Sequence, residues 1–327
     1  VVPDERLSFW NDLYKPKSLV PTSFEFTDIA GLVKGASRGE GLGNKFLSHI
    51  REVDAIVNVV RCFESAEITH VEGKVDPIRD IEIIKTELIL ADLETIDNRI
   101  SKIGKKMEMA KDKKEILEVN TLKHTKELLE NGICLRQAKL SDDEFEVLKT
   151  FNLITLKPVI YVANVGEDDA VVGDNEHSLK VKSYAAEEGS GVIVMSAQIE
   201  SELSDLSEDE KKSFLLELGI INSGLDKLIY QTYSLLGLRT FFTAGSDEVR
   251  AWTFVEGMKA PKCAGIIHTD FERGFIRAEV MSYDDLVTFG SELKVKEAGK
   301  LRLEGKDYEM QDGDICYFRF NVWTKKK

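Results

Sequence analysis

Short apolar segments that end in polar or glycine residues constrain the fold of this chain most strongly. Segments 55–60, 158–164 and 191–196 are nearly continuous apolar runs. Such runs are typical of strands that are covered on both faces, as in a parallel sheet. Segment 23–27, which ends at Asp28, is a fourth predicted strand. The sequence therefore predicts an α/β domain whose sheet is mostly parallel.

A long segment between these predicted strands has helical spacing instead. No proline occurs between Pro77 and Pro158. Apolar residues recur at intervals of four and three, at Ile89, Leu93, Ile96, Ile100, Ile103 and Met107. Similar spacing resumes after the polar segment 111–114, which predicts an antiparallel helical hairpin inserted into the α/β domain. Two interpretations remain open: a projecting arm that binds a partner, or two amphipathic helices that pack on their own domain.

The last part of the chain changes character. Short β-type runs at 250–254, 274–278 and 315–320 are separated by turn residues, and one helical segment at 283–289 interrupts them. This pattern is typical of a small α+β domain. We therefore expect three domains. They comprise residues 1–77 with 153–239 (α/β), 78–152 (helical hairpin) and 240–327 (α+β).

Composition excludes several classes of protein. The 327 residues carry a formal net charge of −14, which argues against broad, nonspecific binding to a phosphate backbone. No apolar run is long enough for a membrane span. The four cysteines lie far apart and form no C-x-x-C pair, which favours free thiols in a reducing cytoplasm over a zinc site or a disulfide framework.

The first motif with chemical content follows the predicted strand at 23–27. Asp28 can hold magnesium through water, and Gly31 can offer its backbone N–H to a γ-phosphate. A glycine-rich segment follows as far as Gly43, as a nucleotide-dependent switch requires. Taken alone, the pattern is more typical of a flexible surface loop.

Two further motifs follow strands. Asn164 and Glu167 have the spacing with which GTPases read the base, but those proteins place Asp where Glu167 stands. The longer carboxylate should weaken the preference for guanine. Ser196, Ala197 and Gln198 follow the next strand, where a small turn can bring its backbone against a base. Either motif alone could be a polar turn, but the three in this order predict a P-loop GTPase-type domain.

The segment DIAGLVKGASRGEGLGNKFL at 28–47 is more specific, and with it the whole chain resembles the YchF / Obg-like ATPase family of the Obg branch. The resemblance extends to the runs at 243–253 and 265–278. It implies a P-loop NTPase domain with an inserted helical hairpin and a C-terminal TGS domain of β-grasp fold. It also implies a cytoplasmic, ribosome-associated hydrolase that binds ATP and Mg²⁺, with K⁺ as a further candidate, and Val165 offering backbone contacts to adenine.

The same resemblance assigns two catalytic positions. Leu32 stands where many GTPases place a water-orienting Gln, and an aliphatic side chain cannot orient water. His70 matches the position that the family suggests for this role, although a solvated loop histidine is an equal alternative. Slow intrinsic hydrolysis is the expected consequence.

One expected element is missing from the sequence. The phosphate-binding pattern G-x-x-x-x-G-K-[ST] does not occur, since none of the four Gly-Lys pairs is followed by Ser or Thr. We therefore expect that an N-terminal strand–loop–helix unit, which would carry this loop, is absent from these 327 residues. Without it, ATP binding should be weak.

The last domain combines basic and aromatic residues. The basic ones are Arg250, Lys259, Lys262, Arg273 and Arg277. Interleaved basic and aromatic residues can neutralise phosphates and stack on bases. The resemblance to a TGS domain implies contact with RNA or the large ribosomal subunit there. The alternative is a small aromatic core with solvated charges. For the whole chain, the alternatives are an Obg-type GTPase and a non-catalytic adaptor that binds RNA or the ribosome, with protein partners at the helical hairpin.

Overall fold

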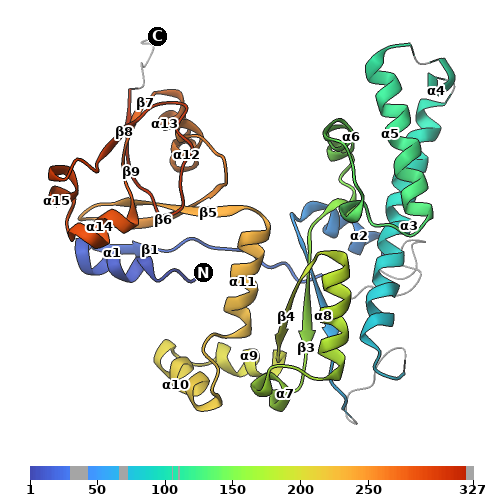
Figure 1. Cartoon of the computed structure of the whole chain (residues 1–327), viewed down its shortest axis with the longest axis horizontal. Helices are drawn as coiled ribbons and strands as arrows, with labels where there is room; N and C mark the ends of the chain where they lie inside the picture. The colour runs from blue at the N-terminus through green and yellow to red at the C-terminus, as the bar shows by residue number, and fades with distance from the viewer. Residues whose placement is uncertain (30–42, 66–72, 105, 110, 322–327) are drawn as a thin grey trace. The chain divides into compact units, whose positions relative to one another are not determined.

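A computed structural model describes residues 1–29, 43–65, 73–104, 106–109 and 111–321 (Figure 1). The chain divides into two compact units. One consists of residues 27–228, and the other combines residues 1–26 with 229–327.

The first unit contains the predicted parallel sheet. Strands β2 (Ile56–Arg61), β3 (Val159–Asn164) and β4 (Gly191–Met195) are parallel and lie in the order β2-β3-β4. Helices α3 (Pro77–Ile103) and α8 (Glu176–Glu188) pack on one face of the sheet. The remaining helices of this unit are α2 (Gly43–Glu52), α4 (Lys106–Met109), α5 (Lys113–Glu130), α6 (Asp142–Leu148), α7 (Glu167–Val172), α9 (Ala197–Ser204) and α10 (Glu208–Leu218). The prediction of a mostly parallel α/β domain is confirmed.

Segment 23–27 is not a strand, so that prediction was wrong. Its apolar residues favour a strand, but a strand persists only where a neighbour satisfies its backbone groups. Among the described residues, β2 pairs with β3, and no strand pairs with segment 23–27.

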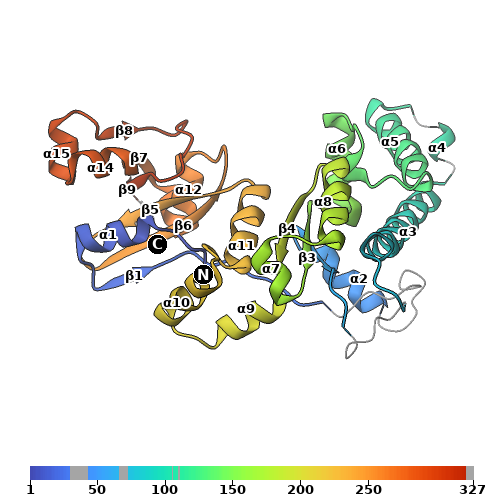
Figure 2. The ribbon, with the colours of Figure 1, turned by 60° about the horizontal axis from the view of Figure 1, so that its bottom comes forward.

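The predicted helical hairpin is present. Helix α3 begins with Asp76 as its N-cap and Pro77 in its first turn, and it ends at Gly104. Helix α5 returns alongside α3 (Figures 1 and 2). Leucine and isoleucine side chains of both helices form one core, which includes Ile89, Ile96, Leu122 and Leu129. Because α3 also packs on β2 and α8, the hairpin is continuous with the α/β unit.

A buried carboxylate connects this hairpin to the sheet. Asp92 of α3 is fully buried and accepts hydrogen bonds from the backbone N–H groups of Ile154 at 2.9 Å and Thr155 at 2.8 Å. The hydroxyl of Thr155 donates a third at 2.6 Å. These two residues open a short 3-10 turn, Ile154–Leu156, that leads into β3, so Asp92 fixes where the hairpin meets the sheet.

The second unit is built on a six-stranded sheet in the order β1-β6-β5-β9-β7-β8 (Figure 2). Its strands are β1 (Ser18–Val20), β5 (Leu238–Ala244), β6 (Glu248–Val255), β7 (Phe275–Met281), β8 (Arg302–Glu304) and β9 (Ile315–Phe320). Its helices are α1 (Arg6–Tyr14), α12 (Ala260–Ile267), α13 (Thr269–Arg273), α14 (Tyr283–Phe289) and α15 (Glu292–Glu297). Helix α11 (Gly224–Leu235) begins in the first unit and ends in this one.

The N-terminal residues belong to a different unit from the one expected, because the expected division placed residues 1–77 in the α/β domain. Strand β1 pairs in parallel with β6, and Trp10 of α1 is fully buried against Phe242 of β5. Residues 1–26 therefore complete the sheet and core of the C-terminal unit. No helix in the described part of the chain has both the length and the apolarity that a membrane crossing needs.

Candidate functional site

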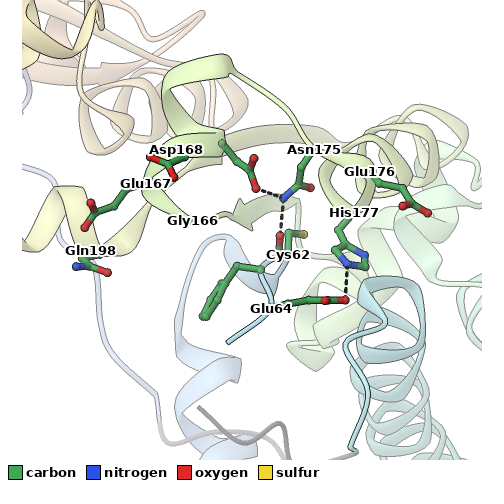
Figure 3. A pocket seen from close by; sticks show the side chains of 11 residues that line it. Cys62, Glu64, Gly166, Glu167, Asp168, Asn175, Glu176, His177 and Gln198 are labelled. Carbon is green, nitrogen blue, oxygen red and sulfur yellow. Dashed lines mark hydrogen bonds and ion pairs between the residues drawn. The ribbon is translucent and has the colours of Figure 1, made fainter. Parts of the chain in front are cut away.

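A pocket of about 710 Å³ opens where β2 and β3 end (Figure 3). Its walls come from the segments that follow these strands and from the starts of α7, α8 and α9. The lining residues are Cys62, Phe63, Glu64, Gly166, Glu167, Asp168, Asp169, Asn175, Glu176, His177 and Gln198. Ligands of open parallel sheets bind at this carboxyl edge.

The structure joins the second and third predicted motifs directly. The side-chain oxygen Oδ1 of Asn164 accepts a hydrogen bond from the backbone N–H of Ala197 at 2.9 Å. The N–H of Val165 donates to the carbonyl of Met195 at 3.0 Å. Because β3 and β4 are parallel neighbours, their carboxyl ends meet, and the two loops are held in one register.

The remaining residues of these motifs divide into buried and exposed ones. Ser196 is buried and caps α9 by accepting a hydrogen bond from the N–H of Ile199 at 3.4 Å. Val165 is also buried, and it is not among the residues that line the pocket. Glu167 and Gln198 are exposed and line the pocket (Figure 3).

The first motif is described only in part. Asp28 lies in an exposed position and is not among the residues that line the pocket. Gly31, Leu32 and His70 lie outside the described residues. Of the predicted magnesium-binding and catalytic positions, the structure therefore describes Asp28 alone.

The pocket also contains residues that the sequence analysis missed. Asn175 donates from Nδ2 to the carbonyl of Cys62 at 2.7 Å and to the carboxylate of Asp169 at 2.9 Å (Figure 3). Its Oδ1 accepts from the N–H of Ser178 at 2.8 Å, and the hydroxyl of Ser178 accepts from the N–H of Asn175. The spacing of Asn175 and Ser178 in the sequence is a local signal that could have predicted the capping box. No local signal could have predicted the contact of Asn175 with the end of β2.

The electrostatic character of the pocket is acidic. Five carboxylates line it, on Glu64, Glu167, Asp168, Asp169 and Glu176. Nε2 of His177 lies 3.5 Å from the carboxylate of Glu64. Polyphosphate charge is disfavoured next to these groups, whereas an uncharged base, whose amino group can donate to a carboxylate, is not. This side of the site therefore suits a base better than phosphates.

Cys62 has the position of a possible nucleophile but the wrong protonation state. Burial, with a smaller contribution from the charge of Asp80, raises the pKa of its thiol to about 12. The reactive thiolate is then rare near neutral pH. Cys62 is a structural residue of the pocket wall.

The basic residues of the last domain are mostly paired. Lys262 lies 2.7 Å from Glu272, Lys259 lies 3.0 Å from Asp307, and Arg277 lies 3.6 Å from Glu279. Arg250 is also paired, with Glu248, and its guanidinium group lies over the ring of Trp252. Arg273 is exposed at the end of α13. Of the aromatic residues, Phe254 and Phe275 are core, and Phe271 stacks on Phe320. A free row of stacking rings is therefore not present among the described residues.

Comparisons with known proteins agree with this geometry. Residues 13–165 match a family model described as a 50S ribosome-binding GTPase. Residues 238–321 match the model YchF-GTPase_C, which is described as a protein of unknown function. The parallel sheet, the paired loops of Asn164 and Ala197 and these matches define a GTPase-type P-loop nucleotide-binding domain with a C-terminal YchF domain.

The family follows from individual relatives. The chain is 58% identical to "Ribosome-binding ATPase YchF" of Bacillus subtilis, over 98% of this chain and 88% of the relative. It is 45% identical to "Obg-like ATPase 1" of Caenorhabditis elegans, over 98% and 82%. The solved YchF GTPase of Schizosaccharomyces pombe is 41% identical and superposes with a TM-score of 0.87, over 97% of this chain and 86% of that one. The chain belongs to the YchF family.

Proposed function

We propose that this protein is a ribosome-associated ATPase, a switch that binds ATP with Mg²⁺ and hydrolyses it slowly to ADP. The names of its relatives support ATP hydrolysis and ribosome binding. The observation that carries the proposal is the hydrogen bond between Asn164 and Ala197, because it joins two loops at the carboxyl edge of the sheet, where we propose that the base binds. The free, buried cysteines fit a cytoplasmic protein.

Selectivity for adenine rests on the pocket wall. Glu167 is exposed at the position from which GTPases accept two guanine N–H bonds, and its carboxylate is one methylene longer than theirs. Phe63 also lines the pocket and can cover the flat face of a purine. The backbone of Val165 would contact the base, and Gln198 would close its edge.

The phosphate side would use residues of the first motif. Asp28 would hold Mg²⁺ through water, and the N–H of Gly31 would contact the γ-phosphate. Leu32 cannot orient water, so His70 is our candidate for that role, with K⁺ as a possible aid to charge neutralisation. Magnesium would supply charge neutralisation at the phosphates. The exposed carboxylate of Asp28 suits an ion held through water.

An unpaired edge of the parallel sheet bears on where the phosphates would bind. In the described residues β2 pairs only on one side, although its sequence is apolar. We propose that a further parallel strand at this open edge carries the G-x-x-x-x-G-K-[ST] loop toward the pocket.

Base preference is tested by competition between ATP and GTP for a fluorescent adenine nucleotide. We expect ATP to compete about tenfold better, because guanine cannot form both hydrogen bonds in good geometry. Glu167→Asp should shift the preference toward GTP, whereas Glu176→Asp, which shortens another pocket carboxylate, should not. Equal competition by GTP in the unsubstituted protein would instead favour the Obg-type GTPase.

Association with the ribosome is tested by co-sedimentation with 70S ribosomes and with isolated subunits. A switch should sediment differently with ATP, with ADP and without nucleotide, by about threefold or more. We expect the large subunit to retain the protein through the basic surface of Arg250, Lys259, Lys262, Arg273 and Arg277, while the helical hairpin contacts proteins. Identical sedimentation in all three states would favour a non-catalytic adaptor.

A further inference from the structure

Helix α10 lies outside the hydrophobic core. None of its residues is buried. Its ends are fixed locally: Ser207 and Glu210 form a capping box, and Gly219 ends the helix with a φ of 72°. Local capping signals define the ends of this helix, and none of its side chains is fully buried. Its apolar side chains are therefore available to another molecule.

The second half of this helix is apolar. Phe214, Leu215 and Leu218 are only partly buried, and Leu216 is 80% exposed. Just beyond the helix, Ile221 is 92% exposed. Single exposed apolar residues are ordinary, but a run of this kind within eight residues is typical of a binding surface.

The charge around this run is strongly negative. Residues 202–217 contain six acidic and two basic side chains. One lysine, Lys211, is already paired with Glu208 at 3.0 Å. Glu202, Asp209 and Glu217 take part in no ion pair within the described residues. Carboxylates at this density repel RNA and anionic lipid, and they attract a cationic partner.

We infer that residues 214–221, which we call the α10 surface, bind a lysine- and arginine-rich amphipathic segment of another protein. Leucine-type side chains of the partner would cover Leu216 and Ile221, and its basic side chains would meet Glu202, Asp209 and Glu217. This interaction is independent of the proposed ATPase reaction, because none of these residues lines the nucleotide pocket.

The probe is a fluorescein-labelled synthetic helix of about 18 residues with leucine on one face and lysine elsewhere. Its binding to the full chain is followed by fluorescence anisotropy, with a glutamate-for-lysine peptide as the charge control. We expect saturable binding of the lysine peptide only, weakened by added salt. Hydrogen exchange should slow in residues 208–221. Protection elsewhere, or equal binding of the glutamate peptide, would overturn the inference.

Two matched variants locate the contact. The double substitution Leu216→Ser and Ile221→Ser should weaken peptide binding about tenfold and leave thermal unfolding unchanged, because both side chains are exposed. Leu293→Ser with Leu303→Ser, which removes two exposed leucines of the other unit, should have no effect. Unchanged affinity in the first variant would contradict the α10 surface. Concentration-dependent dimers that this variant abolishes would show instead that a second copy covers it.

Discussion

Asp92→Ala is expected to destabilise the first unit by about 3–5 kcal/mol. The carboxylate is fully buried and accepts all three of its hydrogen bonds from Ile154 and Thr155. Its removal leaves two backbone N–H groups without an acceptor and opens a cavity between α3 and the turn that precedes β3. Urea unfolding measures the loss, and hydrogen exchange at the two amides locates it.

Two further substitutions separate this effect from a general loss of charge. Asp92→Asn keeps the size of the side chain but turns one acceptor into a donor that faces other donors, so we expect an intermediate loss of about 2 kcal/mol. Asp97→Ala, on the same helix, removes an exposed ion pair with Lys126 and should cost less than about 1 kcal/mol. Similar losses for Asp92→Ala and Asp97→Ala would show that the buried contact is not what fixes the hairpin.

Much of the first unit could be predicted because its signals are local. Segment 158–164 is continuously apolar, and β3 is buried along nearly its whole length. The spacing of Ile89, Ile96 and Ile100 likewise predicts the helical face that packs against α5. In both cases the geometry of the strand or helix sets which of its side chains share a face. The sequence pattern is therefore sufficient to predict the element and its buried side.

The wrong or missing predictions have a common physical cause. Each depends on which segment, distant in sequence, pairs with or contacts the residues concerned. Segment 23–27 has the composition of a strand but lacks a described partner in the sheet. Strand β1 has only three residues, and its partner β6 lies about 230 positions away in sequence. The bond from Asn175 to the carbonyl of Cys62 likewise spans 113 positions. Local pattern carries no information about such pairings.

Trp10 is the residue that most directly tests the assignment of the N-terminal segment to the C-terminal unit. Its side chain is fully buried and lies edge-on or tilted against four aromatic rings, those of Phe9, Tyr14, Phe242 and Tyr283. Its neighbours form the core that also contains Leu286 and Ile315. Removing this indole would leave a large cavity between α1, the sheet and α14.

Trp10→Ala should therefore destabilise the second unit by about 3–5 kcal/mol, since the cavity cannot be filled by small movements of several elements. Hydrogen exchange should accelerate in β5, β6 and α14 and stay unchanged in β3, which belongs to the other unit. Phe26→Ala removes an exposed ring from the same N-terminal segment and should change stability by less than about 1 kcal/mol. If Trp10→Ala left exchange in β5 and β6 unchanged, residues 1–26 would not be part of that fold.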